Sequence, residues 1–226
     1  MIFIGPTEIA GIATSLCAGF HRINIEAELV LKESHPFGYK YPLEQHWLLR
    51  LWMRLAALNS AASRKQITRK IFFSFSYRLC QAIVFSWCLQ RYDTFIFIFG
   101  ETITNTRLEL WLLKALGKVV IFLYLGSDTR PPYICGAAFP AGYPVDIYWA
   151  NARTAKIKQR LHHQEKYATA CINVPSSSQF HEKPFINWYS IGLPKDISCF
   201  PSRKVNRQLN QKVRILHSPS NPMVKG

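Results

Sequence analysis

The chain has 226 residues, of which 49% are hydrophobic, so it is long enough and apolar enough to bury a core. Its formal net charge of +15, from 28 Lys and Arg residues against 13 Asp and Glu residues, favours anionic partners such as phosphates or acidic lipid headgroups. No zinc-finger, homeodomain or RNP signature occurs, and a nucleic-acid partner is therefore not expected. The cysteines show no CxxC motif, which is typical of reduced thiols packed inside a cytoplasmic protein.

A strand–helix–strand unit is expected at the start of the chain. Ile2–Ile4 and Glu26–Leu31 are the predicted strands, and the segment between them places its apolar residues on one helix face. The connecting turn, GPTEIAGIATS, brings Gly11 and Thr14 near a helix N-terminus, where backbone N–H groups attract an anion. The dinucleotide fingerprint GxGxxG is absent. Gly11 and Thr14 therefore either bind a substrate or simply join the strand to the helix.

Two apolar helices are predicted next, over Leu43–Leu58 and Ile67–Gln90. The inward residues expected in the first helix are Trp47, Leu48, Leu51, Trp52 and Leu55, and those in register along the second are Ile71, Phe75, Leu79, Ile83 and Trp87. Because Arg78 lies in the middle of the second helix, we expect a buried or surface-lying helix and not a membrane span. The basic segment 64–70 either docks on an acidic membrane face or forms a solvated turn.

The central part of the chain predicts a buried parallel sheet. Thr94–Phe99 and Lys118–Leu125 are continuous apolar runs that do not alternate with polar residues, so both faces of each strand should be buried. Between them, Thr104–Leu116 reads as a helix with Gly117 as its C-terminal cap. The predicted fold class is therefore α/β, with a Rossmann-like parallel sheet and helices on both faces.

The candidate catalytic residues follow these two central strands. In open parallel sheets, ligands bind at the carboxyl ends of strands, and Glu101 and Asp128 lie directly after them. Asp128 either acts as a general base on an acceptor hydroxyl or caps its own loop through Thr129 or an ion pair with Arg130. Arg130 either faces a phosphate or bonds a loop carbonyl. Glu101 either joins the site or is a helix N-terminal acid.

The remainder of the chain predicts a helix, two strands and the start of another domain. Asp146 is expected to cap the helix Ile147–Tyr167, and Ala168–Val174 and Phe185–Ile191 are the predicted last strands. The adjacent histidines 162 and 163 have no third ligand at usable spacing, so no metal site is expected. The domain organisation predicted is a domain over residues 1–194, a linker over 195–212, and the first strand and loop of a further domain over 213–226.

Several segments resemble the N-terminal, acceptor-side half of GT-B-fold glycosyltransferases of the bacterial polysaccharide type. The resemblance rests on GPTEIAGIATSLCAGF, IEAELVLK, YDTFIFIFGETI, LLKALGKVVIFLYLGSDTRPPY and RILHSPSNPMVKG, and it covers essentially the whole chain. It implies transfer of a hexose from a nucleotide-sugar, such as a UDP- or GDP-sugar, to a glycan or lipid-linked acceptor, with no cofactor and no bound metal. Lys225 stands where the family places a lysine on the donor diphosphate, although the arginine that often precedes it is missing.

The resemblance also implies that the donor-binding domain is absent after its first strand. Transfer by this chain alone is then expected to be weak or absent, because the chain is truncated or a second polypeptide supplies the other half. The expected location is cytoplasmic, at or near the inner face of the cell membrane. The alternative is a non-catalytic module that binds an acidic lipid or glycan at the membrane surface. A nicotinamide-binding protein ranks last, because it would need the glycine fingerprint and a ribose-binding acid.

Overall fold

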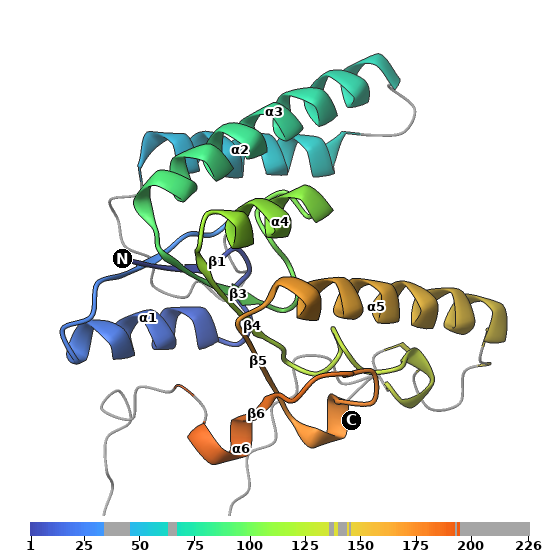
Figure 1. Cartoon of the computed structure of the whole chain (residues 1–226). Helices are drawn as coiled ribbons and strands as arrows, with labels where there is room; N and C mark the ends of the chain where they lie inside the picture. Colours follow the sequence, from blue (N-terminus) through green and yellow to red (C-terminus); the bar gives the residue numbers. More distant parts are fainter. Residues whose placement is uncertain are drawn as a thin grey trace, which may run out of the picture.

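All six strands of the computed structural model run parallel in one sheet, in the order β2-β1-β3-β4-β5-β6 (Figure 1). The structure describes residues 1–33, 46–62, 67–135, 138–139, 144, 146–192 and 194. The strands are β1 (Ile2–Gly5), β2 (Ala27–Leu29), β3 (Thr94–Ile98), β4 (Val119–Leu123), β5 (Ala170–Asn173) and β6 (Ile186–Asn187). The α-helices are α1 (Ile12–Arg22), α2 (Trp47–Ala61), α3 (Ile67–Arg91), α4 (Arg107–Ala115), α5 (Ile147–Tyr167) and α6 (Trp188–Ile191).

The sheet is buried on both faces because its central strands β3 and β4 are apolar at nearly every position, with side chains that alternate between the two faces. In β3, Phe95 and Phe97 point into one core, whereas Ile96 and Ile98 point into the other. Helices α2 to α5 cover the phenylalanine face, and α1 and α6 cover the opposite face (Figure 1). The predicted α/β class, a Rossmann-like parallel sheet with helices on both faces, is confirmed.

The ends of several elements differ from the predictions. The helix Ile147–Tyr167 is confirmed, and the Asp146 carboxylate accepts the Trp149 N–H at 2.9 Å as its N-cap. The strand predicted over Phe185–Ile191 is wrong, because β6 is only two residues long and α6 follows it directly. The side chain of Asn187 causes the change of structure, since it accepts the Tyr189 N–H at 3.0 Å and starts the helix.

The buried faces of α2 and α3 also differ from the predictions. Leu48 and Trp52 of α2 are buried as predicted, but Trp47 and Leu51 are exposed and Leu49 meets the core as well. In α3, four of the residues predicted to share a register, Ile71, Phe75, Leu79 and Ile83, are exposed, while Cys80, Gln81, Val84, Phe85 and Cys88 are buried. Both helices are apolar on more than one side, so periodicity alone does not say which side faces the sheet.

The described cysteines fit the predicted packed thiols. Cys17, Cys80, Cys88, Cys135 and Cys171 are all free and buried. Burial raises the pKa of Cys171 to about 11, which keeps its thiol protonated at neutral pH. The predicted linker over 195–212 and the predicted strand and loop over 213–226, with Lys225, lie outside the described residues.

Candidate functional site

The chain leaves the carboxyl ends of β1 and β3 toward opposite edges of the sheet. After β1 the next strand, β2, is added on one side, and after β3 all later strands are added on the other side. The loops that follow β1 and β3 therefore diverge, which is the arrangement that opens a ligand crevice in open α/β sheets. Thr7 follows β1 and Glu101 follows β3, so both lie at this switch point.

Side chains from three loops meet at the switch point. Lys32, which follows β2, forms an ion pair with the Glu101 carboxylate, and Thr7 Oγ1 donates to Glu101 Oε2 at 3.5 Å. The Lys32 backbone N–H also donates to Pro6 O at 3.0 Å, which ties the loop after β2 to the loop after β1. The Glu101 side chain keeps 31% of its surface exposed. A substrate hydroxyl can therefore reach an oxygen acceptor and an ammonium donor at one place.

The backbone before Glu101 is held in an uncommon conformation. Phe99 and Gly100 have φ values of 62° and 60°, and a positive φ is sparsely populated for a bulky residue such as phenylalanine. Gln164 of α5 fixes this turn, because its Nε2 donates to Gly100 O at 2.8 Å while its Oε1 accepts the Tyr124 hydroxyl at 3.0 Å. The direction of the Glu101 side chain is thus determined by α5 and β4 as well as by its own loop.

Asp128 lies after β4, at the same edge of the sheet, but its carboxylate is turned into its own loop. Asp128 Oδ1 accepts the backbone N–H of Gly126 at 2.8 Å and that of Leu125 at 3.1 Å. The residue is only 4% exposed, and burial raises the pKa of its carboxyl against the opposing effect of these N–H donors. These contacts match the loop-cap alternative, with Leu125 and Gly126 as partners in place of Thr129 or Arg130.

Arg130 faces the neighbouring strand and not Glu101. Its guanidinium donates to Ser177 Oγ at 3.1 Å, after the end of β5. Its Nε atom is buried and has no hydrogen-bond partner in the described part of the chain. Arg130 therefore braces the loops after β4 and β5.

The anion at the start of α1 is supplied by the protein itself. Glu8 Oε2 accepts the Thr14 hydroxyl at 2.6 Å and the Thr14 N–H at 2.9 Å, and Glu8 Oε1 accepts the Ala13 N–H at 3.2 Å. Gly11 is the N-cap, with φ of 74°. The sequence predicted an anion at this helix N-terminus but not that Glu8 supplies it, although the helix dipole favours an acid just before a helix.

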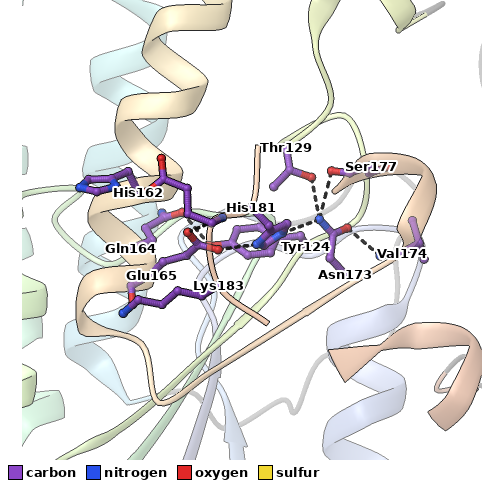
Figure 2. A network of polar contacts seen from close by, with 11 residues as sticks. Tyr124, Thr129, His162, Gln164, Glu165, Asn173, Val174, Ser177, His181 and Lys183 are labelled. Atoms are coloured by element: carbon purple, nitrogen blue, oxygen red, sulfur yellow. Dashed lines mark hydrogen bonds and ion pairs between the residues drawn. The ribbon is translucent and has the colours of Figure 1, made fainter. Parts of the chain in front are cut away.

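A buried polar network fastens the loop after β5 to α5 (Figure 2). His181 Nδ1 lies 2.6 Å from Glu165 Oε1, and both side chains are 2% exposed. Asn173 Nδ2 lies 2.8 Å from His181 Nε2 and 3.1 Å from Thr129 Oγ1. The amide then donates to Nε2, which assigns the His181 proton to Nδ1 and directs it at Glu165. The sequence reading missed this network, since its members are spread over three elements without a motif.

Two hollows lie near the sheet, at different ends of it. The larger, of about 990 Å³, lies beside the edge strand β2 and is lined by residues that precede β1 and β2, such as Met1, Asn24 and Glu26. The smaller, of about 250 Å³, adjoins Gly100 and Thr102 and is lined by the basic side chains of Arg107, Lys156 and Arg160. Only the smaller hollow reaches the carboxyl end of a central strand. Strand topology therefore favours the smaller hollow as a ligand site, although the other hollow is larger.

Within the described residues, no group of three His, Cys, Asp or Glu side chains lies close enough to hold a metal ion. His162 is exposed and pairs with Glu182 at 2.8 Å, whereas His163 is half-buried and packs edge-on against the Tyr167 ring. Comparison of the chain with models of known protein families, with curated proteins and with solved structures finds no match.

Proposed function

We propose that this domain is the acceptor-side half of a glycosyltransferase that moves a hexose from a UDP- or GDP-sugar to a hydroxyl of a glycan or lipid-linked acceptor. The observation that carries the proposal is the meeting of Thr7, Lys32 and Glu101 at the switch point of the parallel sheet. Strand-end crevices of this kind are where open α/β sheets bind their ligands. Three of the segments that resemble the GT-B family, GPTEIAGIATSLCAGF, IEAELVLK and YDTFIFIFGETI, contain Thr7, Lys32 and Glu101.

Glu101 is the proposed general base. The acceptor hydroxyl gives its proton to the Glu101 carboxylate while its oxygen forms the bond to the anomeric carbon. The bond from the anomeric carbon to the diphosphate oxygen breaks, and the diphosphate leaves with the electron pair. Lys32 and Thr7 orient the carboxylate and supply donors to the acceptor oxygens. Lys225 is the proposed contact to the donor diphosphate.

Asp128 has a positioning role in this proposal. Its side chain holds the turn after β4, and its backbone oxygen accepts a hydrogen bond from the Arg160 guanidinium. Arg160 in turn lines the smaller hollow next to Gly100. The basic lining of that hollow suits the phosphate of a lipid-linked acceptor, because guanidinium and ammonium groups bind phosphate oxygens through charge-assisted hydrogen bonds.

Transfer of radiolabel tests the proposal. The full chain, expressed with and without the coding sequence that adjoins codon 226 in the genome, is incubated with labelled UDP-glucose or GDP-mannose and a membrane extract of the producing cells. We expect label to appear in the lipid or glycan fraction in at least one of these forms. A protein that folds and leaves the extract unlabelled in every form would contradict the proposal.

A further inference from the structure

The outward side of α3 carries a continuous apolar surface. Six large residues along it have between 50% and 67% of their surface exposed, and we refer to them as the α3 apolar face. Its members are Ile67, Ile71, Phe72, Phe75, Leu79 and Ile83. They span more than four helical turns, which is about 25 Å of helix. Single exposed apolar residues are ordinary, but a contiguous patch of this length marks an interaction surface.

The charged side chains that α2 and α3 themselves carry are all basic. Neither α2 nor α3 contains an aspartate or a glutamate. Arg69 and Arg78 are exposed on α3, and Arg50 and Arg54 are exposed on α2. A surface that is apolar along one side and basic around it complements an acidic partner that also offers apolar groups.

The helix is anchored so that it lies along such a partner and does not cross it. Its C-terminal half is packed into the domain through Val84, Phe85 and Cys88, and Gln81 Nε2 donates to Ile103 O at 2.8 Å. By length and composition alone α3 qualifies as a candidate membrane span, although part of it is buried inside the domain. Crossing a bilayer would require this packed half to leave the core and would place Arg78 in the apolar layer.

We propose that the α3 apolar face docks the protein on the surface of a membrane rich in anionic lipid, with Phe72 and Phe75 inserted at the headgroup boundary and the neighbouring arginines on lipid phosphates. Interfacial helices bind membranes through this combination of inserted apolar groups and basic charge. In Figure 1, α2 and α3 form the outermost layer on their face of the sheet, so α3 reaches such a surface without a rearrangement of the fold. The inference does not depend on the proposed transferase activity.

Co-sedimentation with vesicles tests this docking. The full chain is mixed with vesicles of phosphatidylglycerol and phosphatidylcholine in equal parts, and with vesicles of phosphatidylcholine alone. We expect binding to the anionic vesicles that weakens as salt is raised. The double variant Phe72→Asp/Phe75→Asp should bind at least about tenfold more weakly, and Arg69→Gln and Arg78→Gln should each lose about fivefold. Because Phe72 and Phe75 are 64% and 67% exposed, these variants should keep the wild-type circular dichroism spectrum.

Matched controls lie on α5, which is also basic. Tyr148 is 90% exposed, and Arg153 is an exposed arginine on the same helix. Tyr148→Asp and Arg153→Gln should leave vesicle binding unchanged. Three results would overturn the proposal: no binding to anionic vesicles, equal binding by Phe72→Asp/Phe75→Asp, or loss of binding only in the α5 variants. A wild-type dimer that the phenylalanine variants dissociate, with no vesicle binding, would assign the α3 apolar face to a second copy of the chain.

Discussion

Lys32 and Glu101 form an ion pair across the carboxyl ends of β2 and β3, although 69 positions separate them in the sequence. Neither strand neighbours the other, because β1 lies between them in the sheet. Their contact therefore bridges the loop after β1, and it defines the place where three chain segments present polar groups together.

The turn before Glu101 requires glycine at position 100. Gly100 has φ of 60°, and an added Cβ would lie 3.4 Å from the Tyr124 ring. We expect Gly100→Ala to lower the free energy of unfolding by about 1–2 kcal/mol, because alanine is strained in the left-handed region. Gly19 in α1 is the matched control, since its Cβ would meet no atom within 4 Å. Gly19→Ala should raise stability by about 0.5–1 kcal/mol, and urea unfolding measures both. Equal effects of the two substitutions would contradict the backbone argument.

The Asp128 carboxylate should contribute mainly to stability. Asp128→Ala leaves the N–H groups of Leu125 and Gly126 without their acceptor, and we expect a loss of about 2–4 kcal/mol in the free energy of unfolding. Asp146→Ala removes an exposed N-cap and should cost about 1 kcal/mol. Chemical denaturation of both variants gives the comparison. If Asp128→Ala proved no more costly than Asp146→Ala, the loop-cap role would be refuted.

The two His–Glu pairs in the described part of the chain should differ strongly in energy. His181→Ala removes the N–H donor of the buried Glu165 Oε1 and leaves that carboxylate only the Glu182 N–H at 3.3 Å, and an underpaired buried charged acceptor costs about 3 kcal/mol. His162→Ala removes an exposed pair with Glu182 and should cost less than about 1 kcal/mol.

A double-mutant cycle with Glu165→Gln isolates the buried contact. Once the Glu165 charge is gone, His181→Ala should cost clearly less than it does in the wild-type chain. Additive costs would show that His181 and Glu165 are not energetically coupled.

Glu28 should make stability depend on acid pH. The Arg91 guanidinium, followed by the Tyr92 hydroxyl, lowers the pKa of Glu28 through hydrogen bonds that burial opposes. Because the pKa in the folded state is below that of the unfolded chain, the contribution is complete above the ordinary glutamate pKa of about 4.3 and disappears as pH falls through the lowered value. The stability difference between wild type and Glu28→Gln, measured by urea unfolding, should therefore shrink as the solution is acidified through this range. A difference that stays constant with pH would contradict the ion pair.

The alternation of strands and helices was predictable from sequence, and the reasons are local. After Thr94, β3 is apolar at every position, which predicted a strand covered on both faces, and Asp146 marked the start of α5 correctly. The sequence did not reveal which side of α2 and α3 faces the sheet, because both sides are apolar. The predicted parallel strands were enough to place Asp128 and Glu101 at the carboxyl edge of the sheet. They did not show that the Asp128 carboxylate faces its own loop, because this depends on the backbone conformation of that loop. The Glu165–His181–Asn173 network joins distant elements and had no sequence signal.

The most direct test of the central claim is the rate of hexosyl transfer by Glu101→Gln, measured in whichever of the two expressed forms transfers label. The amide keeps the shape of the side chain and cannot take the acceptor proton, so kcat should fall by about 10²–10⁴-fold while KM for the nucleotide-sugar stays near the wild-type value. Glu182→Gln, which removes an exposed carboxylate outside the switch point, should transfer at the wild-type rate. Equal rates for Glu101→Gln and wild type would contradict a catalytic role for the switch point.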